Sequence, residues 1–294
     1  MKVLVTGASG LLGTKLTEYA LQSGHAVTSA YSQHRPSYGV PICLDATNEA
    51  KVQEAILSIK PDVVFNTASL TDVDLCEEQP ELAMRVNGQA VGIIARACNK
   101  TGSFLIHLST DYVFDGERGH YREDDKIGPI NVYGRSKLFG ETELAHNAIH
   151  YLLARTSVLY GWDRAYRPNF ATWLVAKLRA GQPVGVVTDQ IASPTLNTNL
   201  AKMLLEAAER RLTGIIHMAG AAPISRYEFA LKLSRICDFN DGLLTPITHS
   251  ATGWKARRPK DSSLDVGKAA QLLDKKPGAI DEALKEFASE VTLK

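Results

Sequence analysis

The amino-acid sequence predicts an α/β fold, a doubly wound parallel sheet with a smaller, discontinuous C-terminal region. Two observations predict this class. Through the first 156 residues, short apolar runs rich in β-branched residues alternate with stretches of helical periodicity, which is typical of a parallel sheet covered by helices on both faces. From about residue 158 onward, the helical stretches are separated by loops rich in proline and glycine, which indicates a region of different architecture.

The alternation begins with a strand at residues 2–6, a glycine turn and a helix at residues 11–22. Further strands are expected at residues 27–31, 42–44, 63–66, 104–109 and 151–156, and the helices among them at residues 49–59, 80–100 and 131–146. Later helices are expected at residues 170–180, 197–210, 227–237 and 280–290. Because residues 214–217 again have the strand pattern, we expect this segment to return to the main sheet.

Composition and charge exclude several classes of protein. The 33 Lys and Arg residues nearly balance the 32 Asp and Glu residues, which argues against nucleic acid or an anionic membrane as a partner. No apolar run approaches the roughly 18 residues that span a bilayer, and no cleavable leader pattern is present, so a cytoplasmic location is expected. The four cysteines and eight histidines are scattered, and neither a disulfide framework nor a metal site is predicted.

Three glycines, Gly7, Gly10 and Gly13, lie between the first strand and the first helix. Residues without side chains allow a tight turn and close approach of the backbone to a pyrophosphate, which the free N–H groups of a helix N-terminus stabilise. This context predicts a Rossmann-type dinucleotide site; an ordinary strand-to-helix turn is the alternative. The neighbouring residues expected to contact the cofactor are Ser9, Leu11 and Leu12.

The second strand ends near residues 31–35, where proteins that prefer NAD usually have an acidic residue for the ribose 2′-hydroxyl. This sequence has none there, and Ser32 and Arg35 can instead bind a 2′-phosphate, which predicts NADPH as the cofactor. If Arg35 is only a solvated loop residue, NADH is the alternative. The ends of the third and fourth strands add further expected cofactor contacts: Asp45, Ala46, Thr67 and Ala68.

These patterns predict a division of the chain into two parts. Residues 1–158 are expected to form a dinucleotide-binding domain, to which residues 187–218 return. Residues 159–186 and 219–294 are expected to form mainly a substrate-binding region.

Tyr133 and Lys137 are four residues apart and therefore lie on one face of the helix predicted at residues 131–146. A tyrosine has a pKa near 10, and a neighbouring cation is expected to lower it. Thr110 closes the fifth strand, at the sheet edge where α/β proteins bind ligands. We expect Thr110 to polarise a ketone, Tyr133 to donate a proton to its oxygen, and Lys137 to stabilise the phenolate. Taken alone, such a Tyr–Lys pair also occurs by chance in structural helices.

Longer motifs extend beyond this common pattern. They include Asn66-Thr67-Ala68, Thr71-Asp72-Val73-Asp74, Ser109-Thr110-Asp111-Tyr112-Val113-Phe114-Asp115-Gly116, Asn131-Val132-Tyr133-Gly134, Arg155-Thr156-Ser157, Asp189-Gln190 and Arg257-Arg258-Pro259. On these motifs the chain resembles, nearly end to end, the dTDP-4-dehydrorhamnose reductase family of extended short-chain dehydrogenases. The resemblance implies reduction of the 4-keto group of a nucleotide-linked 4-dehydro-6-deoxysugar, foremost dTDP-4-dehydro-L-rhamnose to dTDP-L-rhamnose, with Thr110, Tyr133 and Lys137 as catalytic residues.

The resemblance also implies substrate contacts, for which the candidates are Thr71, Asp111, Tyr112, Asn169 and Arg257. Arg257 and its neighbour Arg258 suit a diphosphate through charge-assisted, bidentate hydrogen bonds, unless both are solvated loop residues. One departure concerns the sugar: the family can place tryptophan after the Arg-Thr-Ser strand, and this chain has Val158. The expected partner is a nucleotide sugar whose sugar and base the sequence leaves open, and a homodimer is also left open.

Two other functions fit the same motifs. A nucleotide-sugar epimerase or dehydratase shares the glycines and the Tyr–Lys pair, but it should hold NAD tightly, whereas a reductase should exchange NADPH freely. The regulatory subunit of methionine adenosyltransferase also resembles this family and works as a binding protein. Intact catalytic residues therefore do not by themselves establish turnover.

Overall fold

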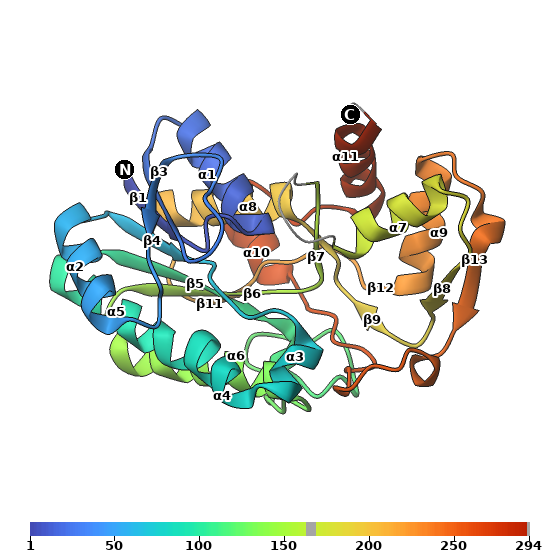
Figure 1. Ribbon diagram of the computed structural model, residues 1–294, viewed down its shortest axis with the longest axis horizontal. Helices are drawn as coiled ribbons and strands as arrows, with labels where there is room; N and C mark the ends of the chain where they lie inside the picture. The colour runs from blue at the N-terminus through green and yellow to red at the C-terminus, as the bar shows by residue number, and fades with distance from the viewer. Residues whose placement is uncertain (163–168, 293–294) are drawn as a thin grey trace.

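The computed structural model describes residues 1–162 and 169–292 and has the predicted α/β architecture. Seven strands form one parallel sheet with helices on both faces, and a smaller group of helices and short strands lies beside it (Figure 1). The Rossmann-type fold predicted from the sequence is therefore confirmed. The predicted substrate-binding region also takes in residues 163–168 and 293–294, which lie outside the described residues.

The main sheet has the strand order β11-β6-β5-β4-β1-β2-β3. Its strands are β1 (Lys2–Thr6), β2 (Ala26–Tyr31), β3 (Val40–Cys43), β4 (Val63–Asn66), β5 (Phe104–Thr110), β6 (Tyr151–Thr156) and β11 (Gly214–His217). Strand β11 pairs with β6, so the segment expected to return to this sheet does so. The chain runs outward from β1 in one direction through β2 and in the other through β4, and ligands bind beside such a switch point at the carboxyl ends of the strands.

Helices cover both faces of the sheet (Figure 1). One face is covered by α1 (Leu11–Gln22), α8 (Asn197–Glu209) and α10 (Gly267–Leu272), and the other by α2 (Glu49–Ile59), α5 (Ala90–Thr101) and α6 (Val132–Asn147). Alternate residues of β1 enter the two cores: Val3 and Val5 pack under α1, and Leu4 packs on the opposite side. This alternation fixes the orientation of the strand whose end carries the glycine turn.

The helix predicted at residues 80–100 is interrupted in the structure. It consists of α4 (Pro80–Met84), a π-helical turn (Arg85–Gln89) and α5. The wider turn carries the buried Asn87, whose side chain hydrogen-bonds both the N–H (2.8 Å) and the carbonyl oxygen (3.0 Å) of Leu70. The spacing of apolar residues does not distinguish a single π turn from an α-helix, so the sequence predicted one continuous helix.

The smaller group of elements has its own apolar core around Tyr160, Leu174, Phe229 and Phe287. Its helices are α7 (Phe170–Arg179), α9 (Arg226–Ile236) and α11 (Ile280–Thr292). Its strand pairs are β7 (Leu159–Tyr160) with β10 (Thr195–Leu196), β9 (Ile191–Ala192) with β12 (Ile224–Ser225), and β8 (Val184–Val187) with β13 (Leu244–Ile247). The two-residue strands among them, β7, β9, β10 and β12, are too short for a sequence pattern to reveal. Within the described residues, no helix has the length and apolar character needed to cross a membrane.

Candidate active site

The glycine turn after β1 forms the first part of the site. Gly7 has a left-handed backbone (φ 68°), and a Cβ atom there would lie 2.8 Å from the backbone of Ala68. A Cβ on Gly13 would lie 2.2 Å from the carbonyl oxygen of Gly7, so α1 packs on the turn only without a side chain there. At Gly10, the N-cap of α1, the nearest atom to such a Cβ is 3.2 Å away, and no side chain caps the helix. The turn therefore leaves the helix N-terminus open to a pyrophosphate.

The neighbours of these glycines divide between surface and core. Ser9 and Leu11 are half-buried on the turn, whereas the Leu12 side chain lies in the core beneath α1. Any contact of Leu12 with a cofactor would therefore come from its backbone N–H.

The other predicted cofactor residues follow β2, β3 and β4, which lie beside β1 in the same sheet. Ser32 and Arg35 follow β2 and are both exposed, so their polar groups are accessible to a ligand. Asp45 follows β3 and is also exposed, and its Oδ1 accepts hydrogen bonds from the N–H and the hydroxyl of Thr47 (2.9 and 2.8 Å). Ala46 is half-buried in the same turn.

Thr67, directly after β4, connects the ends of β4 and β1 by a hydrogen bond. Its hydroxyl donates to the carbonyl oxygen of Thr6 at the end of β1 (2.6 Å). The adjacent Ala68 lies against Gly7, as the close approach of the two backbones requires. The predicted cofactor residues therefore gather around the carboxyl ends of four adjacent strands.

Helix α6 carries Tyr133 and Lys137, and Asn131 begins it by accepting the N–H of Gly134 (2.7 Å). The Nζ of Lys137 donates to the carbonyl oxygen of Leu108 on β5 (2.6 Å), and the side chain is buried. Burial lowers the pKa of Lys137 to about 8, against the opposing effect of the Glu141 carboxylate. The ammonium group is thus fixed to the backbone of the strand that ends at Thr110.

The pKa of Tyr133 differs from the value expected from the sequence. Burial raises the pKa of Tyr133 above its usual value, the Asp111 carboxylate raises it further, and a hydrogen bond with Thr110 partly opposes both. The expected net lowering of this pKa is therefore wrong: desolvation of the phenol outweighs any effect of the Lys137 ammonium group, whose hydrogen bond goes to Leu108. Tyr133 therefore remains protonated at neutral pH, as a proton donor must be.

Thr110 is the last residue of β5, and its hydroxyl is held on two sides. Its Oγ1 donates to Oδ1 of Asp111 (3.0 Å) and accepts the N–H of Tyr112 (3.2 Å). The ring of Tyr112 meets that of Tyr133 edge to face, with centroids 5.7 Å apart. The structure therefore brings together Thr110, Tyr112 and Tyr133, with Lys137 on the same helical face as Tyr133.

Asp111, a predicted substrate contact, is hydrogen-bonded by other residues of the protein. It is buried, and its Oδ2 accepts hydrogen bonds from the hydroxyls of Ser157 (2.9 Å) and Ser262, while its Oδ1 accepts from Thr110. Burial raises the pKa of this carboxyl group, and these three hydrogen bonds oppose the rise. Because both carboxylate oxygens have partners within the protein, Asp111 joins the end of β5 to two later segments rather than presenting a free oxygen to a sugar.

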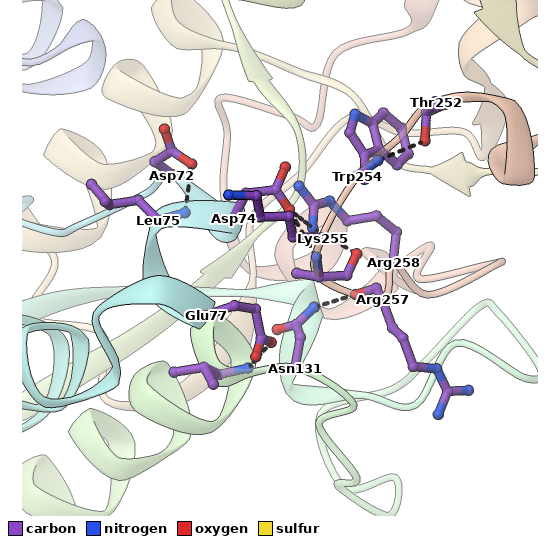
Figure 2. Close-up of polar contacts among 12 residues, drawn as sticks. Asp72, Asp74, Leu75, Glu77, Asn131, Thr252, Trp254, Lys255, Arg257 and Arg258 are labelled. Atoms are coloured by element: carbon purple, nitrogen blue, oxygen red, sulfur yellow. Dashed lines mark hydrogen bonds and ion pairs between the residues drawn. The ribbon is translucent and has the colours of Figure 1, made fainter.

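The two adjacent arginines, Arg257 and Arg258, have different surroundings. Arg258 forms an ion pair with Asp74 of α3 (Val73–Glu78; Nη1 to Oδ1 3.0 Å), and its guanidinium lies over the ring of Trp254. Arg257 is exposed, its carbonyl oxygen accepts a hydrogen bond from Asn131 (2.8 Å), and its side chain points away from Asp74 and Arg258 (Figure 2). The structure thus turns Arg258 toward α3, whereas the side chain of Arg257, the predicted substrate contact, points elsewhere. The two guanidinium groups do not form one joint site for a diphosphate.

Two further predicted substrate contacts have different surroundings. Thr71 is exposed between β4 and α3. Asn169 is the N-cap of α7: its Oδ1 accepts the N–H of Thr172 (3.2 Å), and its Nδ2 donates to the carbonyl oxygen of Gly161 (2.7 Å). Its Oδ1 is thus used to cap α7 and one N–H of Nδ2 is used by Gly161. A sugar contact through the second N–H of Nδ2 stays a prediction.

Three polar residues near the site were not predicted. Gln190 donates to the hydroxyl of Tyr112 (3.0 Å), and Arg226 donates through Nε to Oε1 of Gln190 (2.5 Å). Asn87 donates to the hydroxyl of Ser136, the residue before Lys137 (2.9 Å). Gln190 belongs to a motif that the sequence had singled out, but Arg226 opens a helix with no local pattern to distinguish it.

Comparisons with known proteins agree with this geometry. The family model described as RmlD substrate binding domain matches residues 1–293. The chain is 34% identical to a probable low-salt glycan biosynthesis reductase of Haloferax volcanii, over 98% of this chain and 100% of the relative. It is 33% identical to the dTDP-4-dehydrorhamnose reductase of Aggregatibacter actinomycetemcomitans, over 97% of this chain and 98% of the relative.

The chain is also similar to a third relative and to a solved structure. The methionine adenosyltransferase 2 subunit beta of Xenopus laevis is 32% identical, over 92% of this chain and 82% of the relative. The crystal structure of dTDP-4-dehydrorhamnose reductase from Bacillus anthracis in complex with NADP has a TM-score of 0.89 at 30% identity, over 98% of this chain and 99% of that chain. The chain therefore belongs to the RmlD substrate binding domain family, the dTDP-4-dehydrorhamnose reductase family that its sequence motifs predicted.

Proposed function

We propose that this chain is a sugar-nucleotide reductase that uses NADPH to reduce the 4-keto group of a nucleotide-linked 4-dehydro-6-deoxysugar. The leading substrate is dTDP-4-dehydro-L-rhamnose, and its product is dTDP-L-rhamnose. The observation that carries the proposal is the grouping of Thr110, Tyr133 and Lys137 at the carboxyl end of β5. Relatives named as reductases, at about one-third identity over nearly the whole chain, support the same class of reaction.

A nicotinamide cofactor supplies the hydride that the sugar carbon receives. The turn from Gly7 to Gly13 would hold its pyrophosphate, because Gly10 leaves the N-terminus of α1 open. Ser32 and Arg35 would hold a 2′-phosphate, which supports NADPH over NADH, as does the NADP complex of the Bacillus anthracis relative. Further contacts are assigned to Ser9, Leu11, Leu12, Asp45, Ala46, Thr67 and Ala68.

Tyr133 is the proton donor. Its raised pKa keeps the phenol protonated until negative charge develops on the sugar oxygen, and the phenol proton then moves to that oxygen. Lys137, buried on the same helical face, stabilises the phenolate that remains. The single hydroxyl proton of Thr110 is directed to Asp111 in the structure. When substrate binds, this hydroxyl turns its proton to the ketone oxygen and aligns that oxygen with Tyr133. General-acid catalysis of this kind contributes about 10²- to 10⁴-fold to the rate.

The two parts of the chain take different roles in this proposal. Residues 1–158 are assigned to the dinucleotide-binding domain, together with α8 and β11 of the returning segment 187–218. Residues 159–186 and 219–294 are assigned mainly to the substrate-binding region, with which β9 and β10 of the returning segment pair. Tyr112, whose ring lies edge-on to Tyr133, is assigned as a sugar contact, and the exposed Thr71 as a second one.

The proposal is tested by following NADPH oxidation with a dTDP-4-keto-6-deoxyhexose and with its UDP counterpart. We expect turnover with the dTDP sugar, faster with NADPH than with NADH. Absence of turnover with both sugars would overturn the proposed reaction. Tightly retained NAD in the purified protein would instead favour an epimerase or dehydratase.

A second candidate function rests on the 32% identity to methionine adenosyltransferase 2 subunit beta. In that case the chain would bind a methionine adenosyltransferase catalytic subunit and would not turn over a sugar. Stable co-purification with such a subunit, together with no NADPH oxidation, would favour this role over the reductase.

A further inference from the structure

Arg226 is a cation placed against the candidate active site, and it has no acidic ion-pair partner among residues 1–162 and 169–292. It is the first residue of α9, its Nε donates to Gln190 (2.5 Å), and its guanidinium lies over the ring of Phe170, 4.9 Å from the centroid. Gln190 in turn donates to the hydroxyl of Tyr112, whose ring contacts Tyr133. Only two side chains therefore separate Arg226 from the proposed proton donor.

The charge on Arg226 is only partly offset by its surroundings. No aspartate or glutamate in the described parts of the chain forms an ion pair with it. Burial and the positive charge of Arg258 lower its pKa, and Tyr112 and the Asp111 carboxylate oppose this lowering. The N-terminus of a helix also disfavours a cation, because the helix dipole is positive there. Of its five N–H groups, one is used by Gln190. A partly buried guanidinium in this position is better suited to binding an anion than to stabilising the fold.

The surroundings of Arg226 support a ligand site. Arg226 borders a small, mainly apolar hollow of about 10 Å³ together with Val158, Tyr160, Phe170 and Pro194. This hollow has room for no more than about one water molecule, so a diphosphate would bind beside it, on the side of Tyr112. The Tyr160 hydroxyl is buried and has no hydrogen-bond partner among the described residues, so a polar group of a ligand would satisfy it. Val158, a β-branched residue, is held in a left-handed backbone conformation (φ 33°), and such strain is typical of binding sites.

We propose that Arg226 binds the diphosphate of the nucleotide-sugar substrate. This inference rests on the proposed function. In a hexose linked through C1, the C4 ketone and the diphosphate are at opposite ends of the ring, so a sugar at Tyr133 that lies over Tyr112 would direct its diphosphate toward Arg226. The other nearby cations are less suitable: Arg258 is paired with Asp74, and the Arg257 side chain points away from that pair.

The test compares Arg226→Gln with the wild-type full-length protein by titration calorimetry. The probes are dTDP and UDP, with thymidine and uridine as uncharged counterparts and inorganic pyrophosphate as the anion without a base. We expect Arg226→Gln to weaken binding of the preferred nucleoside diphosphate by about 10- to 100-fold, as loss of charge-assisted hydrogen bonds implies, and to leave nucleoside binding unchanged. The sugar substrate should show a raised KM with little change in kcat, because the diphosphate is bound equally in the ground and transition states.

Two matched variants make the result specific. Arg235→Gln removes an exposed arginine at the other end of α9, whose ion-pair partner within the described residues is the exposed Asp241, and should leave dTDP affinity unchanged. Arg226→Lys keeps the charge without the planar donors and should bind dTDP with intermediate affinity. If Arg226→Gln unfolds, Arg226→Lys supplies the same comparison at a smaller expected change.

The outcomes separate this inference from the function on which it rests. If the wild type binds dTDP or UDP and turns over the sugar, but both Arg226 variants bind it equally well, the assignment of Arg226 is wrong and the reductase stands. If Arg257→Gln loses the affinity instead, the diphosphate lies at the loop of residues 252–260. If the wild type binds neither nucleotide, the proposed function itself fails.

Discussion

Arg155 and Glu141 form a bidentate ion pair inside the protein, one helical turn beyond Lys137. Nε of Arg155 lies 3.0 Å from Oε1 of Glu141, and Nη2 lies 2.7 Å from Oε2. The side chains are 1% and 6% exposed, and the hydroxyl of Ser109 donates to the same carboxylate. The pair fastens helix α6, which carries Tyr133 and Lys137, to β6 and β5. It therefore links the stability of the fold to the position of the proposed catalytic groups.

Replacing one partner of this ion pair should be strongly destabilising. Glu141→Gln leaves the Arg155 guanidinium buried without a counter-charge, and we expect a loss of about 3–5 kcal/mol in the free energy of unfolding, measured with urea. The double variant Glu141→Leu/Arg155→Leu removes both charges and should lose clearly less. A double variant that loses more than Glu141→Gln would contradict this account, because the pair would then be stabilising on balance.

Tyr133→Phe should reduce kcat for sugar reduction by about 10²- to 10⁴-fold, since it removes the proposed proton donor and leaves the ring in place. NADPH affinity, measured by fluorescence quenching, should change by less than about twofold. Phenylalanine keeps the ring that meets Tyr112 edge to face, so the variant should fold as the wild type does. A loss of kcat can then be attributed to the missing hydroxyl. Activity close to that of the wild type would show that another group is the acid.

The main sheet could be predicted from the sequence because its signals are local. The strands at Lys2–Thr6, Val63–Asn66 and Tyr151–Thr156 and the helix at Glu49–Ile59 have the predicted bounds, since each is a continuous apolar or periodic run. The two-residue strands β7, β9, β10 and β12 are set by long-range pairing and have no such run. The same holds for the π turn, which is set by the contact between Asn87 and Leu70.

The candidate site was predicted where spacing along the chain determines proximity. Tyr133 and Lys137 share a helical face, and Thr110 ends the neighbouring strand. Directions of side chains were harder to predict: Arg257 and Arg258 are adjacent in sequence, and only tertiary contacts with Asp74 and Asn131 decide which one turns toward α3. Arg226 was missed because its neighbours Gln190 and Phe170 are distant in sequence.

The pH dependence of the reaction should follow the ionisation of Lys137. Burial lowers the pKa of Lys137 to about 8, so the ammonium is present below this pH and is lost as the pH rises. We expect kcat/KM to be level below about pH 8 and to fall roughly tenfold per pH unit above it. Because Glu141 raises the pKa of Lys137, any folded Glu141→Gln protein should show the fall at lower pH. A profile that stays level to pH 10 would mean that the charge on Lys137 is not required.

Gly13 and Gly10 should respond differently to the same methyl group. A Cβ at Gly13 would meet the backbone of Gly7 at 2.2 Å, so Gly13→Ala should destabilise the fold by about 1–3 kcal/mol or more. A Cβ at Gly10 would have one close neighbour, the carbonyl oxygen of Gly7, at 3.2 Å. Gly10→Ala should therefore fold with a smaller loss in the free energy of unfolding, but its methyl group should obstruct binding of the pyrophosphate. Thermal unfolding and NADPH titration distinguish the two effects. Equal loss of stability in both variants would contradict the open turn at Gly10.

We expect Arg35 to decide the choice between NADPH and NADH in the proposed site. Its side chain is exposed after β2, and Arg35→Gln removes the charge without a buried contact to disturb the fold. We expect the KM for NADPH to rise about tenfold, as loss of a charge-assisted hydrogen bond to the 2′-phosphate implies, and the KM for NADH to stay within about twofold. NADH lacks that phosphate and serves as the internal control. An equal rise with both cofactors would show that Arg35 acts on a part of the dinucleotide that they share, and the preference for NADPH would then have to come from Ser32 or from another residue.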